Sequence, residues 1–168
     1  MSDTLFRVSP LEETHDRSMF KSGSEALDSY FRERVTQDIR RRVTACFVAL
    51  SSNGRIAGYY TLASASVFLG DLPGKFIKNL PRYPSVPAVR MGRLAVDDAC
   101  KGQGLGSALL ADALQRVIRS EIAAYALVVD AKDATAAEFY RYHGFIETAG
   151  EPLTLFLPLA TASGLLIT

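Results

Sequence analysis

Three glycines at alternate positions separate an apolar, strand-like run from a helical pattern. Gly102, Gly104 and Gly106 follow Leu94–Val96 and lead into Ser107–Arg119. Because glycine lacks a Cβ atom, the backbone here can adopt positive φ angles and approach a ligand closely. Successive N–H groups, together with the positive end of the helix, would then bind an anion such as a pyrophosphate. The same spacing also fits a strand-to-helix connection that binds nothing.

Spacing excludes two common phosphate-binding motifs. A P-loop needs G-x-x-x-x-G-K-[ST], and no Gly-Lys pair lies at that distance from Gly102. The dinucleotide motif G-x-G-x-x-G/A fails because neither frame has Gly or Ala at its third position. The remaining pattern, Lys101-x-x-Gly104-x-Gly106, resembles the R/Q-x-x-G-x-G/A coenzyme A loop of the GNAT acetyltransferases. Lys101 replaces Arg or Gln at a position that the family uses largely through its backbone.

A second pattern lies on the helix predicted for Ala134–Tyr142. It reads A-x-x-F-Y-x-x-x-G-F and consists of Ala136, Phe139, Tyr140, Gly144 and Phe145. It is similar to the last conserved helix of GNAT enzymes, and this resemblance implies that Tyr140 is the general acid. Asp133 stands where the family often has Asn, which puts one coenzyme A hydrogen bond in question.

The resemblance implies acetyl-CoA as the co-substrate and assigns its contacts. The pyrophosphate would lie on the loop formed by Lys101, Gly102, Gln103, Gly104, Leu105, Gly106 and Ser107. The pantetheine arm would bond to the backbone of Leu94, Ala95 and Val96 as an added strand does. The later helix would contribute Asp133, Ala136 and Phe139.

The chemistry of Tyr140 suits the role of acid. A phenol with a pKa of about 10 is protonated at neutral pH, whereas a thiol has a pKa of about 8.5. Tyr140 would therefore keep its proton until the thiolate leaves, or stabilise the sulfur by a hydrogen bond. The alternative is a half-buried core tyrosine. Tyr142 lies about 200° around the helix from Tyr140, and His143 fits a helix cap better than a base.

No general base stands out. Asp97, Asp98 and Glu138 are possible, and each is as easily a solvated side chain. A base is dispensable if the amine is partly neutral, and an α-amino group has a pKa of about 8, against about 10.4 for Lys. Esterification lowers that pKa further, which favours an aminoacyl ester as acceptor. Cys100 lacks a neighbouring His in the sequence and is interpreted as a plain thiol.

Composition predicts one domain spanning residues 1–168. The formal charge of +1 means that an anionic partner must be held by a local basic patch. The two cysteines, Cys46 and Cys100, form neither a disulfide framework nor a zinc motif, so no metal is expected and a reducing cytoplasm fits. The first residues lack a signal pattern, and no apolar run is long enough to span a membrane.

Periodicity predicts a mixed α/β fold. Ser22 and Glu25 have capping-box spacing before an amphipathic helix over about 24–41. Strands are expected at Thr4–Val8, Thr44–Leu50, Arg55–Ala65, Ala88–Val96, Ile122–Val129, Phe145–Thr148 and Leu153–Leu157, with Asn53-Gly54 turning the first hairpin. The prolines between residues 68 and 87 exclude a central strand there but allow one short basic helix. No element is predicted beyond Pro158.

The GNAT resemblance adds the arrangement of these elements. A central, mostly antiparallel sheet is flanked by helices. It is splayed at one parallel pair, Ala88–Val96 beside Tyr125–Val129.

Six further segments narrow the resemblance. They are Met19–Asp28, Ala57–Leu62, Leu80–Pro84, Gly92–Asp97, Val128–Lys132 and Leu155–Leu159. They look like segments of the GNAT toxins of type II toxin–antitoxin systems, which acetylate the α-amine of charged tRNA and stop translation. The resemblance implies aminoacyl-tRNA as substrate, a small ribbon-helix-helix antitoxin as partner, and a homodimer. It does not say which tRNA is modified.

With tRNA as substrate, seven basic residues become candidate phosphate contacts. Ranked from the strand that feeds the glycine loop, they are Arg90, Arg93, Lys75, Lys78, Arg82, Arg40 and Arg41. Simpler interpretations exist for each group: outward-facing strand positions, a solvated loop, and favourable cations at a helix C-terminus.

Two other functions fit the same motifs. One is a GNAT enzyme acting on a small amine or a protein N-terminus. The other is an acyl-CoA-binding regulatory module without activity.

Overall fold

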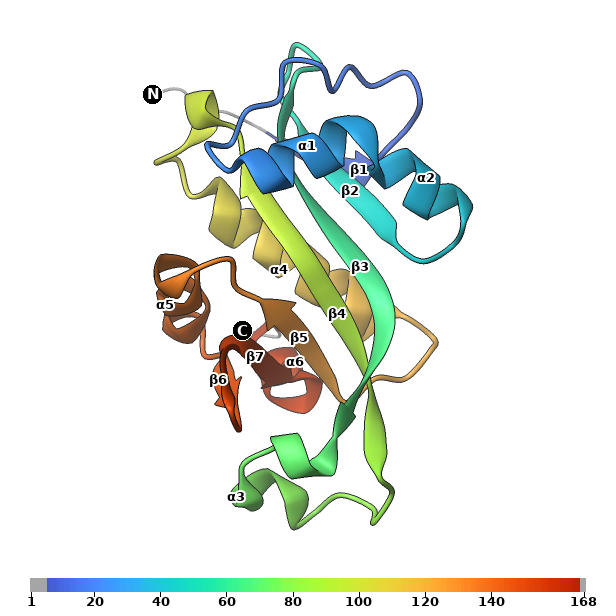
Figure 1. Cartoon of the computed structure of the whole chain (residues 1–168), viewed down its shortest axis with the longest axis vertical. Coiled ribbons are helices and arrows are strands. Elements are labelled where there is room, and N and C mark those ends of the chain that lie inside the picture. The colour runs from blue at the N-terminus through green and yellow to red at the C-terminus, as the bar shows by residue number, and fades with distance from the viewer. Residues whose placement is uncertain (1–5, 167–168) are drawn as a thin grey trace. The chain divides into compact units, whose positions relative to one another are not determined.

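The computed structural model describes residues 6–166, which contain a seven-stranded sheet in the order β1-β2-β3-β4-β5-β7-β6 (Figure 1). The strands are β1 (Arg7–Pro10), β2 (Ala45–Leu50), β3 (Ile56–Phe68), β4 (Ser85–Val96), β5 (Ala126–Asp130), β6 (Ile146–Thr148) and β7 (Glu151–Pro158). Strands β4 and β5 run parallel, from Ala88 opposite Ala126 to Met91 opposite Val129. The predicted mixed sheet with one parallel pair is confirmed.

The contacts divide the chain into two compact units. The first comprises Met1–Ala63 and Arg93–Ala113, and the second comprises Ser64–Gly92 and Leu114–Thr168. Strands β3 and β4 and helix α4 (Leu105–Arg119) pass from one unit into the other. Each unit has its own buried apolar cluster.

The first unit is built on the β2–β3 hairpin. Its turn is the predicted one, with Gly54 at a φ of 81° and the Ser51 N–H donating to the Arg55 carbonyl over 2.9 Å. Tyr59 and Tyr60 point to opposite faces, as strand alternation predicts. The Tyr59 hydroxyl donates to the Leu27 carbonyl at 2.7 Å, and the Tyr60 hydroxyl donates to an Asp112 carboxylate at 2.5 Å. Both rings are buried because helices cover both faces.

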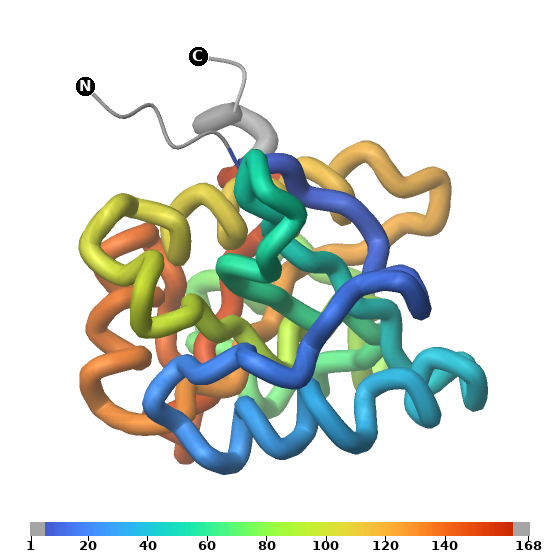
Figure 2. Tube along the Cα trace, turned by 90° about the horizontal axis from the view of Figure 1, so that it is seen from above, coloured from blue at the N-terminus to red at the C-terminus, as the bar shows by residue number. Residues whose placement is uncertain are grey.

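The helix predicted over about 24–41 is two helices, α1 (Glu25–Glu33) and α2 (Val35–Arg40), which follow one another along one side of the first unit (Figure 2). Arg34, with a φ of −122°, interrupts them. The Arg17 guanidinium donates to the Phe31 carbonyl over 2.6 Å, which takes up the acceptor that Val35 would use in a continuous helix. The four-residue apolar repeat survives because both helices face the same core.

The predicted capping box is also shifted. The N-cap of α1 is Ser24, whose hydroxyl accepts from the Leu27 N–H at 3.4 Å. Ser22 instead donates from its hydroxyl to the buried Asp28 at 2.5 Å. Both serines are polar residues of the cap region, and only the packing of Asp28 decides between them.

The second unit contains the segment that joins β3 to β4. A short helix, α3 (Gly74–Ile77), follows a 3₁₀ turn, η1 (Leu69–Asp71), and confirms the predicted short helix. Strand β4 nevertheless begins at Ser85, so Pro87 lies within a strand, contrary to the prediction. Proline lacks only the N–H donor, and the Pro87 carbonyl still accepts from the Tyr125 N–H over 2.8 Å.

The remaining boundaries also differ from the prediction. The first strand is Arg7–Pro10, and Thr4 and Leu5 of the predicted strand lie outside the described residues. Strand β5 begins at Ala126 because Ile122 is exposed and its neighbours form bends. Helix α5 (Ala134–Tyr142) agrees with its prediction, and α6 (Leu159–Leu166) follows β7, where no element was expected. Among the described residues, no helix has the length and apolar character to cross a bilayer.

Candidate active site

The glycine loop is anchored by Asp97, the first residue after β4. Its carboxylate is buried and accepts from the Ala99 N–H at 2.9 Å, from the Lys21 N–H at 3.1 Å and from Arg55 at 3.3 Å. These bonds form the short 3₁₀ turn η2 (Asp98–Cys100) that opens the loop. Asp97 was a candidate base, but its oxygens are committed to holding the loop.

Two of the three alternating glycines have the positive φ angles that the sequence predicted. Gly102 has a φ of 80° and Gly104 a φ of 77°, whereas Gly106 does not have a positive φ and lies inside α4, which begins two residues before the predicted start. A Cβ atom added at Gly102 or Gly104 would meet nothing within 4 Å. These two glycines are therefore required by backbone conformation and not by crowding.

The loop leaves a row of backbone donors open. In the part of the chain that the structure describes, the N–H groups of residues 102–106 donate to no backbone carbonyl. They lie at the start of α4, where the first N–H groups of a helix lack intrahelical partners and carry partial positive charge. The Lys101 ammonium does not join them, since it pairs with Asp98 at 3.0 Å and donates to the Ser22 carbonyl. A backbone role for Lys101 is consistent with this geometry.

The residues expected to bind pantetheine lie at the end of β4. Pairing between β4 and β5 ends at Met91 opposite Val129, and β4 continues to Val96. The Ala95 side chain packs into the core of the first unit. The Ala95 side chain is therefore not available to a ligand, and backbone contacts between Leu94–Val96 and pantetheine remain a prediction.

Helix α5 of the second unit carries the other predicted contacts. Asp133 is its N-cap, and its Oδ1 accepts from the Ala136 N–H at 2.9 Å. This bond, together with the Lys132 ammonium at 3.0 Å, lowers the pKa of the Asp133 carboxyl. Asp133 thus starts the helix, and the structure gives it a capping role whether or not coenzyme A also reaches it.

Helix α5 ends at Tyr142, two residues after Tyr140. Gly144 has a φ of 93°, its N–H donates to the Arg141 carbonyl over 3.0 Å, and the Phe145 N–H donates to the Tyr140 carbonyl over 3.1 Å. This pair of bonds is a Schellman motif. It places the Phe145 ring 5.6 Å from the Tyr140 ring, while Phe139 contacts the same ring edge-on at 5.3 Å. The Gly-Phe end of the motif therefore fixes the tyrosine.

Tyr140 is 4% exposed, and its burial raises the pKa of its hydroxyl, with the Asp130 charge acting in the same direction. The Tyr140 hydroxyl makes no hydrogen bond to any residue in 6–166. Within these residues, every fully buried polar side-chain atom has a hydrogen-bond partner. The hydroxyl oxygen is therefore not fully enclosed. A buried ring whose hydroxyl stays protonated and is not used in an internal hydrogen bond has the form that a proton donor needs.

The neighbouring candidates are arranged differently. Tyr142 is 85% exposed, and the His143 ring lies 4.8 Å from the Phe139 ring while its N–H caps the helix. The pKa of the Cys100 thiol is raised by burial and by the Asp97 charge, which is the opposite of what a nucleophile requires. No group of potential metal ligands occurs among the described residues.

Two of the predicted tRNA contacts are engaged inside the protein. Arg90 donates to both oxygens of Asp130 at 2.6 and 2.7 Å, and these two side chains are each about 40% exposed. The Arg93 guanidinium lies 3.4 Å from the centre of the Tyr30 ring, a cation–π contact. Asp130 was missed from the sequence. The signal was an apolar strand that ends in a carboxylate next to a strand that contains Arg90.

The other five cations are less committed. Arg40 makes an exposed pair with Glu13 at 3.4 Å, a kind of contact that contributes little. The Lys75 ammonium lies 5.2 Å from the Phe76 ring. Arg41, Lys78 and Arg82 take part in no ion pair within the described part of the chain. Arg90 and Arg93, which the prediction ranked first, are thus the most engaged of the seven cations, and contact with tRNA stays a prediction for all seven.

Comparison with known families identifies the class of protein. Residues 15–154 match the model described as the acetyltransferase (GNAT) domain, so the chain belongs to the GNAT acetyltransferase family. Its relatives belong to a narrower group, the toxins of this family. It is 36% identical over 158 residues, 93% of each chain, to a protein of Mycobacterium tuberculosis named tRNA-acetylating toxin. It is 28% identical to a probable toxin TacT of Sinorhizobium fredii, over 95% of this chain and 94% of that one.

Solved structures agree with these relatives. AtaT complexed with acetyl-methionyl-tRNAfMet superimposes with a TM-score of 0.87 at 29% identity, covering 97% of this chain and 99% of that one. AtaTR bound with AcCoA gives a TM-score of 0.84 at 29% identity over 99% and 100% of the two chains. A Tyr-to-Phe mutant of AtaT bound to the C-terminus of the antitoxin AtaR gives 0.85 at 25% identity over 97% and 99%. The predicted family and fold are confirmed.

Proposed function

We propose that this protein transfers the acetyl group of acetyl-CoA to the α-amine of aminoacyl-tRNA and so blocks translation. The observation that carries the proposal is the 36% identity to a tRNA-acetylating toxin over 93% of both chains. The open amides of the glycine loop and the protonated, accessible Tyr140 hydroxyl supply the chemical means.

Acetyl-CoA is bound mainly by backbone groups in this proposal. The N–H groups of residues 102–106 donate to the pyrophosphate, whose charge also interacts favourably with the start of α4. Leu94–Val96 bond to the pantetheine amides in the manner of a strand. Asp133, Ala136 and Phe139 supply the contacts from α5.

The reaction needs one proton donor from the protein. The neutral amine attacks the thioester carbonyl carbon, and the bond between that carbon and sulfur then breaks. The departing thiolate accepts a hydrogen bond or the proton from the Tyr140 hydroxyl, and the nitrogen loses its extra proton to water. Where the tyrosine gives up its proton, water returns one to the phenolate. Because burial raises the pKa of Tyr140, the phenol stays protonated at neutral pH and is available when negative charge develops on sulfur.

The acceptor fits an enzyme without a dedicated base. Asp97 is used up in the loop, and Asp98 pairs with Lys101. An α-amine with a pKa of about 8, lowered further by the ester, is substantially neutral at physiological pH, whereas a lysine with a pKa of about 10.4 is not. This difference favours aminoacyl-tRNA over a protein lysine.

Binding of tRNA in this proposal relies on local cations, since the net charge is only +1. Lys75, Lys78, Arg82 and Arg41 are the first contacts to test because none of them is held by a carboxylate. Arg90, Arg93 and Arg40 remain proposed contacts of lower rank. Reversing the charge at Arg90 is a poor test, because it would place two carboxylates together at Asp130.

The proposal extends to the assembly. A cognate ribbon-helix-helix antitoxin neutralises the toxin, the toxin is a homodimer, and it acts in the cytoplasm.

The whole chain works as one GNAT domain, since β3, β4 and α4 each belong to both compact units. A single cooperative unfolding transition by calorimetry is expected. Two resolved transitions would contradict the single domain.

The test of function uses labelled acetyl-CoA. We expect the purified protein to label total charged tRNA, and the label should be released by mild base as N-acetyl amino acid. Deacylated tRNA serves as the matched control and should remain unlabelled. Label on free amines or peptides but not on charged tRNA would replace this proposal with the small-amine alternative.

A further inference from the structure

The connection between β3 and β4, residues 68–85, packs one of its faces against the core of the second unit. Leu72 is buried, Ile77 and Leu80 pack against the cluster of the second unit, and the Phe76 ring meets Phe156 edge-on at 5.2 Å. The Ala149 N–H donates to the Asp71 carbonyl over 2.8 Å. The segment is therefore held to the second unit by apolar and backbone contacts. We call residues 68–85 the hairpin tip.

Two large aromatic side chains of the hairpin tip are left outside this packing. Phe68 is 61% exposed and Tyr83 is 65% exposed. The Leu69 N–H donates to the Pro84 carbonyl over 3.1 Å, so the two segments that carry these rings run next to each other. Aromatic rings that are mostly exposed add little to core packing, and they provide flat apolar surfaces for a partner.

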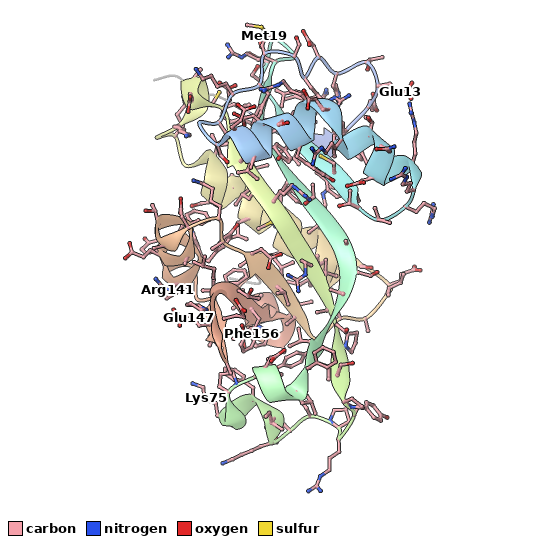
Figure 3. All side chains as sticks on the ribbon, viewed as in Figure 1. Glu13, Met19, Lys75, Arg141, Glu147 and Phe156 are labelled. Atoms are coloured by element: carbon pink, nitrogen blue, oxygen red, sulfur yellow. The ribbon has the colours of Figure 1, made fainter. Side chains whose placement is uncertain are left out.

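The charge around these rings is one-sided. Lys75, Lys78 and Arg82 are exposed on the same tip, and Asp71 is its one acidic residue. Figure 3 shows the Lys75 side chain on α3 at the surface. Lys78 and Arg82 form no ion pair with any residue that the structure describes. Free cations next to exposed aromatic rings attract a polyanion that also carries flat rings.

We propose that the hairpin tip is a stacking platform for the unpaired 3′ end of tRNA. Bases stack on the rings of Tyr83 and Phe68, and Lys78 and Arg82 contact the phosphates between them. This inference rests on the proposed function. A duplex arm would need the cations alone, whereas single-stranded RNA is bound by combining cations with aromatic stacking. The 3′ end is the segment that carries the aminoacyl group.

The test compares two RNA hairpins that contain the same acceptor stem, one with an unpaired 3′ end and one blunt. Stacking on an aromatic ring contributes about 1–3 kcal/mol per base. Tyr83→Ala should therefore weaken binding of the overhanging RNA by roughly 5- to 150-fold and leave the blunt RNA unchanged. Tyr83→Phe keeps the ring and should bind like the wild type. Tyr142→Ala removes another exposed tyrosine elsewhere and is the matched control.

Salt dependence separates the cations from the rings. Lys78→Ala and Arg82→Ala should each lower the slope of log affinity against log salt by about 0.7–0.9. Tyr83→Ala should lower the affinity without changing that slope, since a ring releases no counterions. All variants change exposed side chains, so unchanged thermal midpoints will verify that each one is folded.

Several outcomes would overturn the platform. They are an equal loss on both RNAs, no loss on either, or a Tyr83→Ala variant that alters only antitoxin binding or self-association. Acetylation of charged tRNA by the wild type is measured in parallel. If the wild type acetylates charged tRNA and Tyr83→Ala has an unchanged KM, the platform is wrong and the proposed function stands. If the wild type acetylates no charged tRNA, the proposed function itself fails.

Discussion

The glycine loop and helix α5 carry the two halves of the proposed chemistry, and they are made in different ways. Residues 102–106 offer backbone N–H groups, whose direction depends on two positive φ angles. Helix α5 offers one side chain, whose properties depend on the rings that bury it. A site made of backbone tolerates changes of side chain, as Lys101 illustrates. A site made of one hydroxyl does not.

The cations show the same contrast between available and committed groups. Arg90 and Arg93 are half-buried and held by Asp130 and Tyr30. Lys78 and Arg82 are exposed and without ion-pair partners among the described residues. Position along the chain suggested that the first pair mattered more for tRNA. Contacts in three dimensions show that the second pair is not held by any carboxylate that the structure describes, and the role of either pair in tRNA binding stays a prediction.

The largest effect is expected from removing the single hydroxyl. Tyr140→Phe keeps the buried ring and loses only the proton donor, so the rate of acetyl transfer should fall by about 10²- to 10⁴-fold. Acetyl-CoA affinity should be nearly unchanged, because the Tyr140 hydroxyl is not among the groups proposed to bind acetyl-CoA. Tyr142→Phe, at an exposed position on the same helix, is the matched control. Single-turnover rates and calorimetric affinities would measure both. An active Tyr140→Phe protein would remove the side-chain half of the comparison.

A smaller effect is expected from disturbing the backbone half. Gly104→Ala forces an L-residue to a φ of 77°, which costs about 1–2 kcal/mol. The free energy of unfolding in urea should fall by that amount, and acetyl-CoA should bind more weakly as the amides turn away.

Gly106→Ala is the internal control for the loop. Gly106 lies in α4 without a positive φ, so alanine there should leave the unfolding free energy unchanged or slightly higher. Equal destabilisation by the two substitutions would show that the positive φ of Gly104 does not matter.

The smallest effect is a difference in pH dependence. Backbone amides do not titrate, so the dissociation constant of acetyl-CoA should be flat between about pH 7 and pH 10. The transfer rate should rise with pH as the acceptor amine, with a pKa of about 8, loses its proton. Burial raises the pKa of Tyr140, so its acid form persists and no falling limb is expected below about pH 10. Rates measured across this range would reveal a falling limb if the assignment were wrong.

Much of the fold followed from patterns that are local in the sequence. The β2–β3 hairpin depends on an Asn-Gly turn, and the end of α5 depends on Gly144, so both were predicted correctly. The break at Arg34 was not predicted, because the Phe31 carbonyl is taken by Arg17 from a distant segment. Pro87 lies in a strand for a similar reason, since its carbonyl meets Tyr125 on another strand. Errors arose where a partner far along the chain decided the backbone.

The sequence by itself determined the family and the glycine loop, and it predicted Tyr140 as the acid, because these depend on residue types at fixed spacing within one turn or one helix. Tertiary structure alone decided which carboxylates and cations are free. Asp97 is consumed by the loop, Arg90 is held by Asp130, and the rings of Phe68 and Tyr83 remain outside the core. A side chain's availability depends on its neighbours in space, and periodicity along one chain does not contain that information.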